Sequence, residues 1–104
     1  MDRDVFNRFI IRTKIIKEFR KILDNNDFLE IETPILQNQA SGAMAKTFNT
    51  YHDDYNMNMI LRIACEAEHK IIMTGGYQGV YEFSKDFRNE GSDFTHMQEF
   101  TQIE

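Results

Sequence analysis

Residues 87–104 read FRNEGSDFTHMQEFTQIE and carry the strongest structural signal in this chain. Two stretches with alternating side chains flank a polar segment, which is the pattern of an antiparallel β-hairpin. Neighbouring side chains in a strand point to opposite faces. The hairpin therefore gathers one set of side chains on one face: Arg88 and Glu90 from the first strand, and Phe100, Gln102 and Glu104 from the second.

This face has the wrong composition for a core and a suitable one for a planar, anionic ligand. Arginine binds phosphate in a bidentate manner, and an aromatic ring such as Phe100 can stack on a base. Phe100 and Glu104 are about 13 Å apart along a strand, so they can contact opposite ends of one extended ligand. A solvated, ion-paired face of an antiparallel sheet gives the same pattern, and the residues alone leave both interpretations open.

Upstream of the hairpin, residues 4–24 predict a long helix. Apolar side chains recur there at helical spacing: Val5, Phe6, Phe9, Ile10, Ile16, Phe19, Ile22 and Leu23. Residues 25–27 read Asn-Asn-Asp, which ends the helix because such side chains hydrogen-bond to nearby backbone. Residues 28–33 alternate apolar and polar, so they predict a half-buried strand, which Pro34 ends.

The rest of the chain predicts short elements joined by polar loops. They are a loop at 37–46, strands at 47–50 and 59–63, a helix at 64–74 ended by Gly75-Gly76, a strand from 79 to 83, and a final strand at 99–104. Together they predict one α+β domain over residues 1–104, with an antiparallel sheet and a long N-terminal helix. The chain ends inside an apparent strand, so we expect a shortened domain.

Composition excludes several classes of protein. The 104 residues carry a net charge of −5, whereas a free-standing RNA-binding domain is usually basic. One cysteine allows no internal disulfide and suits a reducing compartment. The sequence has neither an apolar run long enough for a membrane span nor a secretory signal. We therefore expect a cytoplasmic protein.

Four blocks resemble one known family. In chain order they are FLEIETPIL at 28–36 after a long helix, similar to motif 1; SGAMAKTFNT at 41–50 and LRIACE at 61–66, similar to two segments of the lysyl enzymes; and FRNEG…H…EFT…E, similar to motif 2. The chain thus resembles part of a class II lysyl-tRNA synthetase catalytic domain, with motif 1 over about 4–36 and motif 2 over about 83–104. No segment matches motif 3 or the anticodon-binding β-barrel, so we expect both to be supplied from elsewhere.

The resemblance implies a function in protein biosynthesis. It implies ATP-dependent activation of lysine to lysyl-adenylate and transfer to tRNA, impaired where motif 3 is missing. The implied site residues are Arg88, catalytic and on the α-phosphate; Glu90, His96 and Glu99 near ATP; Phe100 on adenine; and Gly42, Glu66 and Glu104 around lysine. Mg²⁺ is implied as a cofactor with ligands outside this chain, and motif 1 implies a homodimer.

Two other interpretations remain open. One is a related ligase that attaches lysine to an elongation factor. The other is a non-catalytic fragment that only binds nucleotide or dimerises. An assay of whether lysine is attached to tRNA or to the factor distinguishes a synthetase from the related ligase. Lysine-dependent ATP consumption distinguishes an enzyme from a non-catalytic fragment.

The sequence also departs from the family pattern. Ser41, Cys65, Glu68 and His69 stand where the family has glycine, proline and largely apolar residues, and Met97-Gln98 replaces Asn-Pro. We expect Cys65 to be a small buried residue. His52, His69 and His96 lack the spacing of zinc ligands, so the sequence predicts no metal site.

Overall fold

The computed structural model describes residues 1–38, 46–91 and 97–104. The predicted loop at 37–46 falls mostly outside these residues, as does much of the hairpin loop. Gly42 and His96 therefore lie outside the described residues. The first two residues of the predicted 37–46 loop, Gln37 and Asn38, belong to a short strand that pairs with residues 59 and 60, so the loop prediction is wrong there.

The long helix α1 spans Arg3–Asn25, one residue more at each end than its sequence pattern predicts. It begins at Asp2, whose carboxylate accepts a hydrogen bond of 2.9 Å from the backbone N–H of Asp4, the usual role of aspartate at this position. It ends where the Asn26 amide donates to the carbonyl of Ile22 at 2.7 Å. The next residue, Asp27, turns the chain with a φ of 65°.

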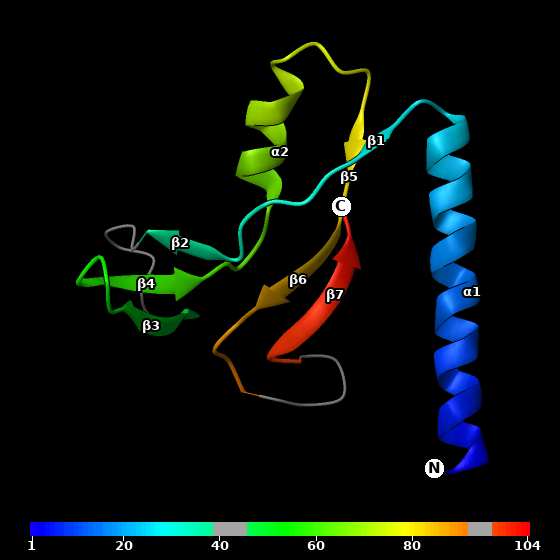
Figure 1. Ribbon diagram of the computed structural model, residues 1–104, viewed down its shortest axis with the longest axis horizontal. Helices are drawn as coiled ribbons and strands as arrows, with labels where there is room; N and C mark the ends of the chain where they lie inside the picture. The colour runs from blue at the N-terminus through cyan, green and yellow to red at the C-terminus, as the bar shows by residue number, and fades with distance from the viewer. Residues whose placement is uncertain (39–45, 92–96) are drawn as a thin grey trace.

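Seven short strands and a second helix follow α1 in the described part of the chain (Figure 1). Their bounds are β1 Leu29–Glu30, β2 Leu36–Asn38, β3 Phe48–His52, β4 Met57–Leu61, α2 Glu66–Met73, β5 Val80–Tyr81, β6 Phe83–Phe87 and β7 Glu99–Ile103. They form three small sheets, two antiparallel with orders β2-β4-β3 and β6-β7, and one parallel pair β1-β5. The α+β class and the antiparallel hairpin are confirmed, and the parallel pair is an addition.

The strand predicted at 28–33 is shorter in the structure. β1 bonds to β5 through Leu29 N–H to the carbonyl of Gly79 and Ile31 N–H to that of Tyr81, both at 2.9 Å. The N–H of Thr33 instead donates to the side chain of Glu82 at 3.2 Å. The ladder therefore stops because a buried carboxylate takes the next backbone donor.

The interior of the chain is small and unusually polar. Among the described residues only Ile60, Cys65 and Tyr81 are buried apolar side chains. Six polar or charged residues are buried as well: Thr47, Arg62, His69, Glu82, Ser84 and Asp86. Gly79 shows how closely some of the chain packs, because a Cβ there would lie 1.8 Å from the Phe28 ring.

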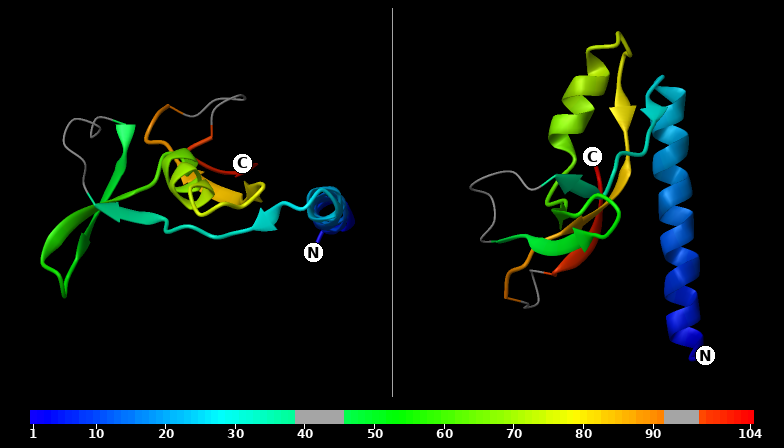
Figure 2. Two further views of the ribbon diagram at one scale, coloured as in Figure 1. Left: turned by 90° about the horizontal axis from the view of Figure 1, so that it is seen from above. Right: turned by 60° about the vertical axis from the view of Figure 1, so that its left-hand side comes forward.

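Helix α1 lies along one side of the rest of the chain and buries none of its own residues (Figures 1 and 2). The accessible surface is 7995 Å², whereas a folded monomer of this mass has about 6,100 Å². The radius of gyration is 16.6 Å, against about 13 Å for a compact domain of this length. The described helices include none that is long and apolar enough to cross a membrane.

Candidate functional site

Arg88 and Phe100 meet at the loop end of the β6–β7 hairpin. The N–H of Arg88 donates to the carbonyl of Gln98 at 2.8 Å, which continues the ladder one step beyond β6. The Arg88 guanidinium carbon lies 5.0 Å from the centre of the Phe100 ring, a cation–π distance. Among the described residues, the Nε of Arg88 is a buried side-chain donor without a hydrogen-bond partner. A cation with a buried, unpaired donor is suited to an anionic ligand.

The other two described residues predicted near ATP differ in position. Glu90 lies two residues after Arg88, and its carboxylate is 3.8 Å from the Lys46 ammonium. Glu99 pairs with Phe87 in the hairpin, so its exposed side chain points to the opposite face from that of Phe100. The structure thus brings Arg88 and Phe100 together and leaves Glu99 on the other side of the sheet.

These carboxylates do not make a magnesium site by themselves. Mg²⁺ takes oxygen ligands in near-octahedral geometry, and among the described residues no three acidic side chains gather around Arg88. We therefore assign no step to the metal ion.

Glu66 and Glu104, predicted to contact lysine, line one cavity of about 500 Å³. Glu66 begins α2, whereas Glu104 follows β7. Glu104 is held by a pair of 3.0 Å backbone hydrogen bonds to Glu82, one in each direction. His69 and Lys70 of α2 line the same cavity.

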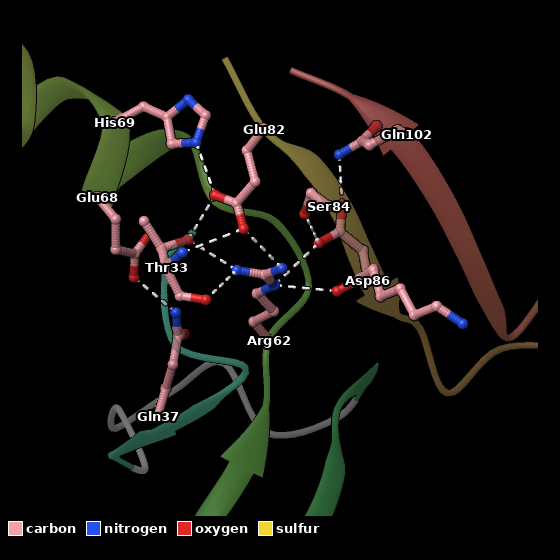
Figure 3. Close-up of polar contacts among 10 residues, drawn as sticks. Thr33, Gln37, Arg62, Glu68, His69, Glu82, Ser84, Asp86 and Gln102 are labelled. Carbon is pink, nitrogen blue, oxygen red and sulfur yellow. Dashed lines mark hydrogen bonds and ion pairs between the residues drawn. The ribbon is translucent and has the colours of Figure 1, made fainter. Parts of the chain in front are cut away.

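Arg62 is the centre of a buried polar network that the sequence did not reveal (Figure 3). It follows β4, and its guanidinium lies 3.1 Å from the Glu82 carboxylate and 3.3 Å from that of Asp86. It also donates to the Thr33 carbonyl at 3.0 Å and to the Lys85 carbonyl at 2.9 Å. One arginine therefore joins the end of β4, the segment after β1, and β6.

Ser84 and Asp86 of β6 are buried near this arginine and make further polar contacts. The Ser84 hydroxyl donates to Asp86 at 2.7 Å, and the Gln102 amide of β7 donates to the same carboxylate. Part of the hairpin face predicted to be open to ligand is therefore an interior polar surface. The sequence signal that could have indicated this interior face is the alternation in β6, where the small polar Ser84 and Asp86 alternate with larger side chains.

Two residues that depart from the family pattern join the same region. His69 Nε2 lies 2.9 Å from Glu82 Oε1, and the Gln37 amide donates to Glu68 at 2.6 Å. Burial favours a raised pKa for the Glu82 carboxyl, but hydrogen bonds from His69 and Thr33 and the charge of Arg62 outweigh it, so the pKa is lowered. Cys65 is fully buried, as predicted, and burial raises the pKa of its thiol.

A second polar cluster connects α1 to the sheets. The Arg20 guanidinium binds both oxygens of Glu30, at 2.7 and 3.0 Å. The buried Tyr81 hydroxyl donates to Asp24 at 2.7 Å, and burial is the main reason why the pKa of Tyr81 is raised. These contacts fix the C-terminal end of α1 against β1 and β5.

The whole chain, residues 1–104, matches the family model described as tRNA synthetases class II (D, K and N). The chain belongs to that family. Its relatives include the lysine–tRNA ligases of Streptococcus gordonii, Streptococcus agalactiae serotype V and Streptococcus thermophilus, each 52% identical to it over 103 residues. These alignments cover 99% of this chain and 21% of each relative, so the chain spans about a fifth of the length of those relatives.

Proposed function

We propose that this chain is the part of a lysine–tRNA ligase that binds ATP and lysine. The protein would activate lysine as lysyl-adenylate and transfer it to tRNA, a reaction of cytoplasmic protein biosynthesis. The observation that carries the proposal is the cavity that Glu66 and Glu104 line together, at the end of the strand that bears Phe100. Two carboxylates from different elements suit a cationic amino acid, because an ammonium removed from water needs charged partners.

ATP would bind at the loop end of the hairpin. Phe100 stacks on adenine, and Arg88 binds the α-phosphate through a guanidinium whose Nε has no partner among the described residues. Glu90 and His96 would lie near the nucleotide, with His96 near the phosphates, whereas Glu99 points to the opposite face of the hairpin. Magnesium, when bound with the nucleotide, would offset phosphate charge.

The first reaction step joins the two ligands. A carboxylate oxygen of lysine attacks the α-phosphorus of ATP, and the bond to pyrophosphate breaks. Arg88 offsets the negative charge that develops on the phosphoryl oxygens. Glu66 and Glu104 accept hydrogen bonds from the amino groups of lysine, and the backbone at Gly42 would lie against the substrate. These contacts hold the carboxylate in line for attack.

Homodimerisation through α1 is the second part of the proposal. The exposed apolar stripe of α1, which we call the α1 apolar face, consists of Ile11, Ile15, Phe19 and Ile22, which follow one another at helical spacing and are each 45–55% exposed. Contiguous apolar surface of this kind marks an interaction site. The excess of about 1,900 Å² over a compact monomer exceeds the roughly 800 Å² that a standard interface buries on each partner.

Lysine-dependent adenylate formation tests the activity. The chain is mixed with ATP and lysine, and pyrophosphate release is measured with and without tRNA or an elongation factor as acceptor. Pyrophosphate release that requires lysine and is lost in Arg88→Ala, together with transfer of lysine to tRNA, supports the proposal. Transfer to the factor alone supports the related ligase, and binding of both ligands without release supports a non-catalytic fragment.

A further inference from the structure

Cys65, His69 and Glu82 form a buried cluster of three side chains that bind metals in other proteins. The Cys65 sulfur, a His69 ring nitrogen and a Glu82 carboxylate oxygen all lie within 4.8 Å of one another. All three residues are less than 9% exposed. The first two lie one helical turn apart, since the N–H of His69 donates to the carbonyl of Cys65 at 3.1 Å. The third reaches them from the segment between β5 and β6.

The separations suit a small cation. Tetrahedral zinc, with bonds of about 2.0–2.3 Å, holds its ligand atoms roughly 3.3–3.6 Å apart. His69 Nε2 and Glu82 Oε1 are 2.9 Å apart, slightly less than that range, and the upper bound of 4.8 Å for the cluster is slightly more. Shifts of about an ångström would therefore seat a zinc ion among the three.

The surroundings lack one positive charge. Arg62 contacts both Glu82 and Asp86, and all three side chains are almost completely buried. Arg62, Glu82 and Asp86 together carry a formal charge of −1. An uncompensated buried charge is costly. A divalent cation that displaces the thiol proton adds one net positive charge and brings the buried sum to zero.

The carboxylate is also held as metal-binding carboxylates usually are. Arg62 donates to Glu82 Oε2 at 3.1 Å, and the Thr33 hydroxyl donates to Oε1 at 2.8 Å. Such partners fix the orientation of a ligand and are part of a metal site. Thiolate, imidazole and carboxylate together suit zinc, whereas calcium and magnesium prefer oxygen ligands alone.

We propose that Cys65, His69 and Glu82 form a zinc site, with a fourth position left for water. Binding releases the proton of the Cys65 thiol, and the sulfur forms the bond to the metal. The ion would link α2 to the strand segment after β5 and supply the missing buried charge. The site does not depend on the proposed activity of the chain.

Metal titration of the purified chain tests this proposal. The chain is first freed of metal by a chelator and then titrated with zinc alone, and bound metal is counted by elemental analysis. Cobalt(II) serves as a second probe, because a thiolate ligand gives a sulfur-to-cobalt charge-transfer band. We expect one zinc per chain, and a cobalt band that Cys65→Ser abolishes.

Two further variants distinguish this site from adventitious binding. Losing one partner around a metal ligand already lowers affinity 10–100-fold, so Cys65→Ser and His69→Leu should each lower zinc affinity by about 100-fold or more. His52→Leu is the matched control, because His52 stacks on Tyr55 at 4.2 Å, in the β3–β4 hairpin and away from the cluster. Zinc affinity that Cys65→Ser leaves unchanged, or no stoichiometric zinc at all, would overturn the proposal.

Discussion

At the scale of single residues, Arg62 has the largest structural role. It lies between two buried carboxylates, from Glu82 and Asp86, and its contacts to backbone carbonyls tie three segments together. Family resemblance supplied Arg88, Phe100, Glu66 and Glu104 from the sequence. It could not supply the Arg62 network, because a charge pair between residues 20 or more positions apart leaves no local pattern.

Replacement of Arg62 should strongly destabilise the fold. Arg62→Met leaves two buried carboxylates without their cation, and breaking a buried pair in this way costs about 3–5 kcal/mol. The free energy of unfolding is measured by urea denaturation. Arg12→Met on exposed α1 is the control and should change it by no more than about 0.5 kcal/mol. A loss below about 1 kcal/mol for Arg62→Met would contradict this account.

The contact between Arg20 and Glu30 should make stability depend on pH. The hydrogen bond from Arg20 lowers the pKa of the Glu30 carboxyl. Its contribution is therefore present above the pKa of the unfolded carboxyl and is lost as pH falls through the lower folded value. Both side chains are more than a third exposed, so solvent screening limits the effect to about 0.5–1 kcal/mol.

Denaturation of the parent and of Arg20→Met between about pH 6 and pH 2 measures this contribution. The parent should be more stable than Arg20→Met at the highest pH of this range, and the difference should vanish at the lowest pH. A stability difference that stays constant across this pH range would contradict the prediction, because the contact would then contribute nothing to acid sensitivity.

At the scale of elements, local chemistry explains what the sequence could predict. Helix α1 agrees within one residue at each end because its caps are local side-chain contacts. β1 was predicted with six residues and has two, because its partner β5 lies about 50 positions away and Glu82 takes the Thr33 donor. Strand pairing over such separations depends on tertiary contacts that periodicity does not contain.

The β6–β7 hairpin should bind ATP through one of its faces. Arg88→Ala removes the proposed phosphate contact, and a hydrogen bond to a charged group is worth about 1.5–3 kcal/mol. ATP affinity should therefore fall roughly 10-fold or more, measured by calorimetry. Lys85→Ala is the matched control, because Lys85 is an exposed cation of β6 whose side chain points to the opposite face from that of Asp86. Equal losses for the two variants would indicate only general charge attraction.

At the scale of the whole molecule, the chain exposes about 1,900 Å² more surface than a compact monomer of its mass. A second copy that covers the α1 apolar face would bury part of this excess. We expect the apparent mass from light scattering to rise with concentration toward that of a dimer. Phe19→Ser should shift the transition to higher concentration, since a buried aromatic residue contributes several kcal/mol.

The control for this experiment lies on a different surface. Tyr55→Ser removes an aromatic residue that is 72% exposed in the turn between β3 and β4, and it should leave the association unchanged. A mass that stays monomeric over the whole concentration range would contradict dimerisation through α1.

The choice of amino acid tests the central claim of lysine binding most directly. Binding of lysine and of norleucine, its neutral isostere, is measured by calorimetry in the presence of ATP for the parent, Glu66→Gln and Glu104→Gln. The parent should prefer lysine, and each variant should lose about 10-fold or more of that preference, because each removes a charged acceptor. Glu104→Gln should cost at least as much as Glu66→Gln, since Glu104 is held by its two backbone bonds to Glu82 and Glu66 is exposed. A parent that binds both amino acids equally, or a preference that both variants retain, would contradict the account.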